Sequence, residues 1–327
     1  MASGEERKLR RRIKSVQSTK KITRAMELIA ASRIVKAQQR VAAARPYSEQ
    51  ITSVMANLAA GGAGLDHPLL EERDPIGKVG FIVISADRGL AGAYNSTIVR
   101  SAERALVGHR DEGRDYELTL AGRKAEGYFR YRGYRIGEAF SGFSEMPSYE
   151  DAREVAQAAM ARYEAGSGED GGVDQVELVY TRFFSIGTQR VVTVRLLPME
   201  RELIEDAAAA RGDGPQTAYE FEPEPAQILE RLLPRYVEAR VFAAMLDAAA
   251  SEQAARQRAM KAATDNAEEL IKNLSTVANK VRQAGITTEI MEIVGGAEAL
   301  RKAKSSGEPD YFADAVVSRD VLPDHLN

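Results

Sequence analysis

The sequence contains no cysteine and no tryptophan, and only three of its 327 residues are histidine. Without cysteine, the chain can form neither a disulfide nor a thiolate metal site. His67, His109 and His325 are too far apart in the sequence to show metal-ligand spacing. No apolar run reaches the roughly 18 residues that a bilayer-spanning helix needs, and the N-terminus lacks the apolar core of a signal peptide. We therefore expect no metal site and no direct membrane insertion.

Aromatic residues are also scarce, at 6% of the chain, whereas charged residues make up 28%. This composition is typical of long helices rather than of a large sandwich or barrel. The net charge of −3 hides an asymmetry, because residues 1–45 hold 13 Lys or Arg against three Glu. That segment therefore carries +10, and the rest of the chain carries −13. A basic segment of this kind is typical of a surface that meets an acidic partner.

Residues 1–59 form the first predicted element, a long helix. Apolar and small residues alternate in steps of three and four along its second half, which predicts a coiled-coil seam. Leu9, Ile13 and Val16, and then Ile22, Met26 and Ile29, show the same stepping with register breaks between the groups. The seam of the second half is Ala37, Val41, Ala44, Ser48, Ile51, Met55 and Leu58.

Residues 60–77 are rich in Gly and Pro and read as a linker. From residue 78 to 200, short apolar runs such as KVGFIVIS (78–85) alternate with helical patterns. This alternation predicts an inserted α/β domain, with its last two strands paired antiparallel through a short connection near Ser185–Gly187.

Residues 201–223 form an acidic loop, and residues 224–304 form a second long helix. A regular seam is expected at Ala263, Ala267, Leu270, Leu274, Val277, Val281, Ala284, Thr288 and Met291. Residues 305–327 form a polar extension. The predicted fold is a long antiparallel coiled coil of the terminal helices with an inserted Rossmann-like α/β domain.

Two other functions fit parts of this pattern. The ADRGLAGAYN segment (86–95) joins a strand to a helix and suggests a dinucleotide-dependent enzyme, but it lacks G-x-G-x-x-G and G-K-[ST]. The basic helix suggests a nucleic-acid binder, but residues 1–45 hold no aromatic side chain to stack on bases. A structural turn and a solvated charged face account for these segments better.

Several motifs resemble the gamma subunit of the F-type ATP synthase. They are RRRIKSVQSTKKITRAMELIAASRIVKAQQR (10–40), SADRGLAGAYN (85–95), LLPRYVEARVFAAMLDAAASEQAARQRAMKAATDNAEELI (232–271) and NKVRQAGITTEIMEIVGGAEAL (279–300). The resemblance covers most of residues 5–300. The absence of cysteine departs from redox-regulated chloroplast members, so the chain is similar to the bacterial type.

The resemblance implies a central-stalk rotor without an active site, part of the H⁺-transporting two-sector ATPase. It would couple rotation of the membrane c ring to conformational change at the catalytic beta-subunit sites. The implied partners are the alpha and beta subunits, epsilon and the c ring, with no nucleic acid and no cofactor. The implied location is peripheral, on the cytoplasmic side of the bacterial cell membrane.

Site residues follow from the same motifs. The resemblance implies beta-subunit contacts at Met26, Arg256, Gln283, Thr287 and Glu289. It implies c-ring contacts at Tyr219, Phe221 and Glu222.

Two departures from the family pattern bear on the fold. Pro234 lies where members usually continue a helix, so we expect a kink or a helix start there. Residues 301–327 extend past the usual end of the family.

Overall fold

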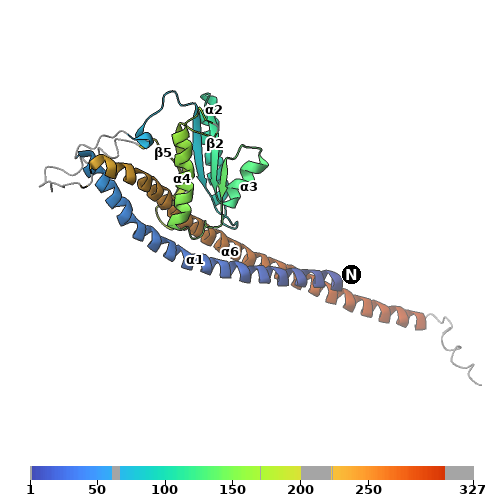
Figure 1. Cartoon of the computed structure of the whole chain (residues 1–327). Coiled ribbons are helices and arrows are strands. Elements are labelled where there is room, and N and C mark those ends of the chain that lie inside the picture. The colour runs from blue at the N-terminus through green and yellow to red at the C-terminus, as the bar shows by residue number, and fades with distance from the viewer. Residues whose placement is uncertain (1, 61–66, 170, 200–221, 223, 306–327) are drawn as a thin grey trace, which may run out of the picture. The chain divides into compact units, whose positions relative to one another are not determined.

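The computed structural model describes residues 2–60, 67–169, 171–199, 222 and 224–305 (Figure 1). Tertiary contacts divide the chain into two compact units, one of residues 1–20 and 265–327 and the other of residues 21–264. Two long helices, α1 (Ala2–Ala60) and α6 (Pro225–Ser305), contribute to both units. No described helix combines the length and apolarity needed to span a membrane.

Proline positions in α6 correct one expectation. The helix begins at Pro225, and proline suits a first turn because the amide hydrogens there lack helical partners in any case. Pro234 lies inside the helix, so the expectation of a helix start at this residue is wrong. The helix also continues through Gly295 and Gly296.

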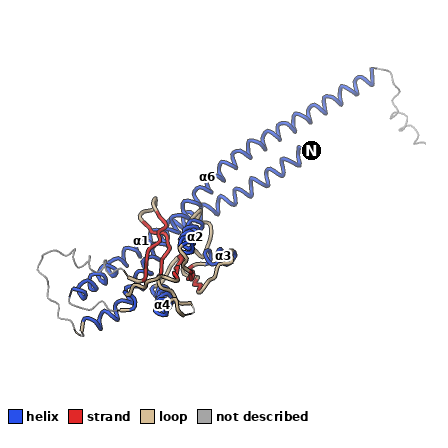
Figure 2. The backbone as a smooth tube through the Cα atoms, turned by 90° about the horizontal axis from the view of Figure 1, so that it is seen from above, coloured by secondary structure: helices blue, strands red, loops and turns tan. Residues whose placement is uncertain are grey.

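The larger unit contains a five-stranded sheet, whose strands are red in Figure 2. The strands are β1 (Lys78–Ile84), β2 (Asp115–Ala121), β3 (Glu138–Phe140), β4 (Gln175–Phe183) and β5 (Gln189–Leu197). Their order is β3-β2-β1-β4-β5, with β5 antiparallel to β4 and all other pairs parallel. Ser185 and Thr188 exchange backbone hydrogen bonds in the connecting turn, which confirms the predicted antiparallel pair.

Helices cover both faces of this sheet. Alternate residues of β1 point to opposite faces, as the two-residue period of a strand requires. Phe81 and Val83 join the core beneath α2 (Tyr94–Asp111) and α3 (Arg123–Tyr131). Ile82 and Ile84 join the core shared with α4 (Tyr149–Ala165) and α6. The arrangement confirms the predicted Rossmann-like α/β fold, and it packs part of α6 directly against the sheet.

The described part of the predicted linker also packs against this unit. A short 3-10 turn, η1 (Pro68–Leu70), buries Leu69 and Leu70 in the core beneath α4. Further along, the Asp174 carboxylate accepts hydrogen bonds from the backbone N–H groups of Gly77 (2.8 Å) and Lys78 (3.1 Å). Residues 67–77 are therefore part of the folded unit.

The two long helices contact each other within each unit. In the larger unit, the hydroxyls of Thr23 and Thr264 are 2.8 Å apart. In the smaller unit, Lys20 Nζ lies 3.1 Å from a Glu268 carboxylate oxygen. Also in the larger unit, Met55 and Leu58 of α1 share a core with Leu229 and Leu233 of α6. Positions that rise along α1 therefore fall along α6 within this unit, which confirms the predicted antiparallel pairing.

Burial corrects the register of both seams. In α1, the inward positions near residue 25 are Thr23, Glu27 and Ala30, whereas Ile22 and Ile29 are more than half exposed. The three-and-four stepping therefore continues from Lys20 to Ile34 without the expected break, because polar residues occupy part of the seam. In α6, Ala267, Leu274 and Val281 lie on the seam as predicted, but Thr264, Ile271 and Ala278 replace Ala263, Leu270 and Val277.

Candidate functional site

An apolar stripe on α1 faces away from α6. The exposed residues Ile22, Leu28, Ile29 and Val35 lie on this side of the helix. Met26 is half-buried in the same stretch, one residue before the buried Glu27, whose carboxylate accepts a hydrogen bond from Arg24 (2.9 Å). An exposed apolar stripe on a helix whose other face is already paired is typical of a partner-binding surface.

The last turns of α6 carry a second exposed apolar surface, which we term the tip surface. Its members are Ile286, Ile290, Met291, Ile293, Val294 and Leu300. Ile286, Ile290 and Ile293 share one helical face, since they are spaced by four and three residues. Met291 and Val294 lie on the adjoining face, so the apolar area is wider than a coiled-coil seam.

Three predicted contact residues lie beside the tip surface. Gln283, Thr287 and Glu289 are all exposed on α6. The Thr287 hydroxyl donates to the backbone carbonyl of Gln283 (3.0 Å), one turn earlier. These side chains are accessible to a partner, and their role in binding one stays a prediction.

Arg256 lies in a different setting from the other predicted contacts, because its side chain is only 6% exposed. Its guanidinium donates to Glu252 (2.6 Å) and to the carbonyl of Gly89 (3.3 Å), and it also lies 3.5 Å from Glu145. Burial raises the pKa of the Glu252 carboxyl, whereas the neighbouring Arg256 acts in the opposite direction. In this chain Arg256 joins the α/β domain to α6, and its contact with a beta subunit stays a prediction.

The three predicted c-ring contacts belong to the segment around residue 220. Glu222 is exposed. Tyr219 and Phe221 lie outside the described residues, as does most of the predicted acidic loop 201–223.

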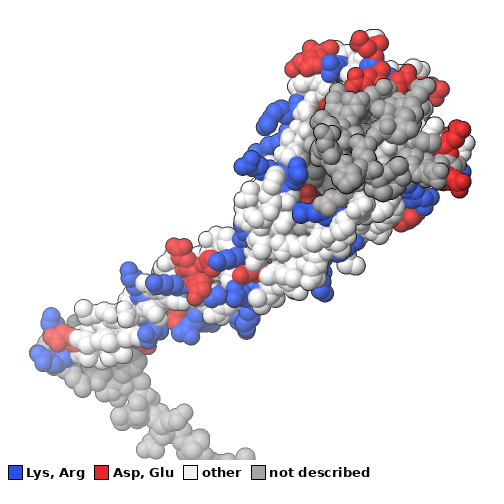
Figure 3. Space-filling view, turned by 90° about the vertical axis from the view of Figure 1, so that its left-hand side faces the viewer, with Lys and Arg blue, Asp and Glu red and all other residues white. Residues whose placement is uncertain are grey.

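Basic side chains remain exposed along α1, and Figure 3 shows Lys and Arg spread along the helices on one face of the molecule. Some of the cations form internal ion pairs, such as Arg10 with Glu6 (2.6 Å). Lys8, Arg11, Arg12 and Lys14 are exposed and form no ion pair within the described part of the chain. The positive charge expected from the sequence is therefore available at the surface.

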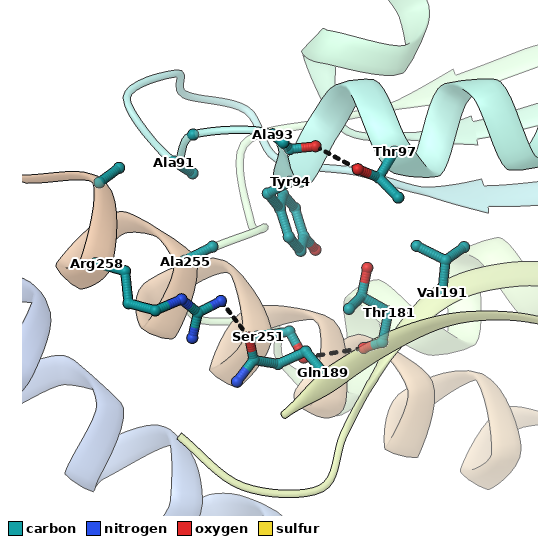
Figure 4. A pocket seen from close by; sticks show the side chains of 12 residues that line it. Ala91, Ala93, Tyr94, Thr97, Thr181, Gln189, Val191, Ser251, Ala255 and Arg258 are labelled. Atoms are coloured by element: carbon teal, nitrogen blue, oxygen red, sulfur yellow. Dashed lines mark hydrogen bonds between the residues drawn. The ribbon is translucent and has the colours of Figure 1, made fainter. Parts of the chain in front are cut away.

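The turn after β1 lies at the point where strand order reverses, which is the usual ligand crevice of a doubly wound sheet. A cavity of about 440 Å³ is found here, lined by residues of the β1–α2 turn, β4, β5 and α6 (Figure 4). Helix α6 closes one side of it, since Tyr94 donates to the carbonyl of Ala248 (3.1 Å) and Ser251 donates to that of Thr181 (3.1 Å). The β1–α2 turn thus packs against α6 of the same chain, which is what a structural turn would do.

Comparisons with known proteins agree with this geometry. The family model described as ATP synthase matches residues 5–300. The ATP synthase gamma chain of Frankia casuarinae is 54% identical, with 91% of this chain and 98% of the relative covered. The gamma chain of Mycolicibacterium smegmatis is 50% identical over the same shares of the two chains. The chain belongs to the ATP synthase gamma-chain family. It is thus a subunit of the ATP synthase complex and not the catalytic one.

Solved structures show the same fold. A chain from the Euglena gracilis mitochondrial ATP synthase, solved as OSCP/F1/c-ring, matches with a TM-score of 0.63 at 17% identity, covering 94% of this chain and 98% of that chain. A chain from the Tetrahymena thermophila mitochondrial central stalk and c ring matches with a TM-score of 0.54 at 24% identity, covering 74% and 99%.

Sequence patterns missed the apolar stripe of α1 as a surface feature. Ile22 and Ile29 fit the expected seam, and only the burial of Thr23, Glu27 and Ala30 shows that they point outward. The sequence does contain a pattern that predicts this, since Lys20, Thr23, Glu27 and Ala30 continue the three-and-four spacing of the seam. A search for apolar residues alone misses it, because three of these four residues are polar.

Proposed function

We propose that this chain is the central-stalk rotor of a proton-translocating ATP synthase. It couples rotation of the membrane c ring to conformational change at the catalytic beta-subunit sites, for ATP synthesis or hydrolysis. Alpha, beta and epsilon subunits and the c ring are its proposed partners. Its proposed location is peripheral, on the cytoplasmic side of the bacterial cell membrane.

The observation that carries this proposal is the tip surface at the end of α6 in a member of the gamma-chain family. Apolar attraction is non-directional, so an apolar shaft can turn inside an apolar collar without breaking a set of oriented bonds at each step. The polar residues Gln283, Thr287 and Glu289 provide specific contacts next to it.

The exposed cations of α1 support an acidic partner surface, for which the acidic levers of the beta subunits are the proposed match. The apolar stripe of α1 lies on the side of the helix that α6 leaves open, and Met26 in the same stretch is half-buried. Tyr219, Phe221 and Glu222 are proposed for the c-ring end. The proposed division of labour is a helical shaft of residues 1–59 and 224–304 and an α/β domain of residues 78–200.

Affinity purification tests this proposal. A tagged copy of the chain is isolated from detergent-solubilised membranes of the source cells. We expect alpha, beta, epsilon and c subunits in fixed ratio, together with ATPase activity. Recovery of the chain alone, with NAD binding, would favour the dinucleotide-enzyme alternative instead.

A further inference from the structure

The turn between β1 and α2 is tied to a second loop by one carboxylate. Asp87 Oδ2 accepts hydrogen bonds from the backbone N–H groups of Gly142 (2.9 Å) and Ser144 (3.1 Å). Asp87 Oδ1 accepts from the N–H of Arg123 (3.1 Å), and the N–H of Asp87 donates to the Ser144 hydroxyl (2.9 Å). Asp87 therefore fixes the loop between β3 and α4 against the carboxyl ends of β1 and β2.

That loop presents Glu145 to three arginines from separate elements. Arg33 of α1 donates a hydrogen bond to the Glu145 carboxylate. Arg256 of α6 lies 3.5 Å from it, and Arg88 of the β1–α2 turn lies 3.9 Å from it. We call Glu145 and these three arginines the Glu145 latch.

The Glu145–Arg256 pair of the latch is partly shielded from solvent, whereas Arg33 and Arg88 are 44% and 70% exposed. The Glu145 side chain is 24% exposed and Arg256 only 6%. Nearby, Arg40 donates a hydrogen bond to the carbonyl of Pro147, so a second α1 side chain holds the same loop. Charge pairs in such a setting keep more of their Coulomb attraction than exposed pairs do.

The latch contacts α1 far from the point where the end of this helix enters the hydrophobic core. Met55 and Leu58 already fix α1 in the hydrophobic core shared with α4 and α6. Arg33 lies 22 residues before Met55, or about 33 Å along the helix at 1.5 Å per residue. The seam residues Ala30 and Ile34 are buried in this same stretch of α1, and the latch adds an attachment of the stretch to the α/β domain.

We propose that Glu145 is the positioning residue that locks α1, α6 and the α/β domain into one torsionally rigid body. Torque entering through the α/β domain then passes into both helices together. This inference rests on the proposed rotor function. It gives the ADRGLAG turn a mechanical role, because Asp87 holds the loop that carries Glu145 and Arg88 flanks it.

The test uses intact complex carrying Glu145→Gln, which keeps the size and hydrogen-bonding capacity of the side chain and removes its charge. Glu150→Gln is the matched control, because Glu150 is an exposed carboxylate on α4 whose ion pair is local, with Arg153 three residues along the same helix (3.2 Å). Arg33→Gln and Arg88→Gln each remove one partner of Glu145. The effect of Arg88→Gln should be the smaller of the two, because Arg88 is farther from Glu145 and more exposed than Arg33.

Two readouts are taken from each complex. Hydrogen exchange of α1 residues 28–40 reports the latch itself, and we expect it to be about tenfold faster in Glu145→Gln, slightly faster in Arg88→Gln and unchanged in Glu150→Gln. The ratio of proton pumping to ATP hydrolysis reports torque transfer. We expect this ratio to fall in Glu145→Gln and Arg33→Gln while hydrolysis is retained.

The outcomes separate the latch from the rotor function. Unchanged exchange in Glu145→Gln overturns the latch. Faster exchange with an unchanged pumping ratio overturns its role in torque transfer and leaves the rotor function standing. Absence of the chain from the purified complex overturns the rotor function itself.

Discussion

Thr23 of α1 and Thr264 of α6 face each other with hydroxyl oxygens 2.8 Å apart, and both side chains are less than a tenth exposed. The Thr264 hydroxyl also donates to the carbonyl of Met260 (2.8 Å). It therefore contacts both the backbone of its own helix, α6, and the Thr23 hydroxyl of α1. This polar pair occupies seam positions that apolar residues would fill in a simple coiled coil.

Replacing either threonine with valine should therefore lower the free energy of unfolding by about 0.5–1.5 kcal/mol, the net worth of a typical internal hydrogen bond. Thr23→Val combined with Thr264→Val should cost less than the sum of the single changes, because the interaction between the two hydroxyls can be lost only once. Urea unfolding of the four proteins measures this cycle. Strictly additive losses would mean that the two hydroxyls do not interact.

Leu274→Asp should strongly reduce the yield of assembled complex, whereas Lys272→Asp should be mild. Leu274 lies on the seam and is 9% exposed, and Lys272 is exposed two residues earlier. Burying an unpaired carboxylate costs several kcal/mol. Blue-native gels of membranes from the two strains compare the yields. Equal yields would refute the seam position of Leu274.

Met26→Lys should leave assembly largely intact and impair coupling. The change places a cation at a half-buried position of α1, from which it would attract the acidic levers proposed for the beta subunits. At a surface-like effective dielectric this contact is worth at most about 4 kcal/mol, and it must be broken at each step of rotation. ATP hydrolysis and ATP-driven proton pumping are measured in the same vesicles. A normal ratio of the two activities would argue against a partner contact at Met26.

Asp247→Asn should stabilise the chain at neutral pH. Burial raises the pKa of the Asp247 carboxyl from 3.8 to about 6, against smaller opposing effects of the Phe183 N–H, Arg182 and Arg45. The folded state therefore holds a proton that the unfolded state has lost between about pH 4 and pH 6, so stability falls as pH rises through this window. Above it, the asparagine variant should be more stable by about 1–2 kcal/mol, after allowance for partial solvent screening.

Denaturant midpoints measured from pH 4 to pH 8 check this prediction. The difference between Asp247→Asn and the parent should shrink toward zero as the pH approaches 4, because both side chains are then neutral. A difference that is independent of pH would show that the carboxylate charge is not the cause.

Much of the fold follows from local patterns that act over short stretches of sequence. The alternation of apolar runs and helical periods predicted an α/β insertion, and the β4–β5 hairpin followed from the short connection near Ser185–Gly187. The motifs at residues 10–40 and 232–300 led to the family. Pro234 does not start a helix, because packing of α6 against the sheet outweighs a local helix-breaking preference, and a kink at this residue stays a prediction.

The residues of the candidate site were predicted from sequence motifs, but their surroundings were not. Gln283, Thr287 and Glu289 were predicted from a motif and are accessible on α6. The motif also named Arg256, but its ion pair with Glu145 joins residues more than a hundred positions apart, which the motif alone does not bring together.

The sequence by itself determined that this chain is a pair of long helices interrupted by an α/β domain, because helical and strand periods are properties of neighbouring residues. The tertiary structure alone decided which faces of those helices are buried. Thr23 and Thr264 point inward and Ile22 and Ile29 point outward because each helix face is set by the partner helix against which it packs. The Glu145 latch likewise exists only once the sheet brings residues 33, 88, 145 and 256 to one place.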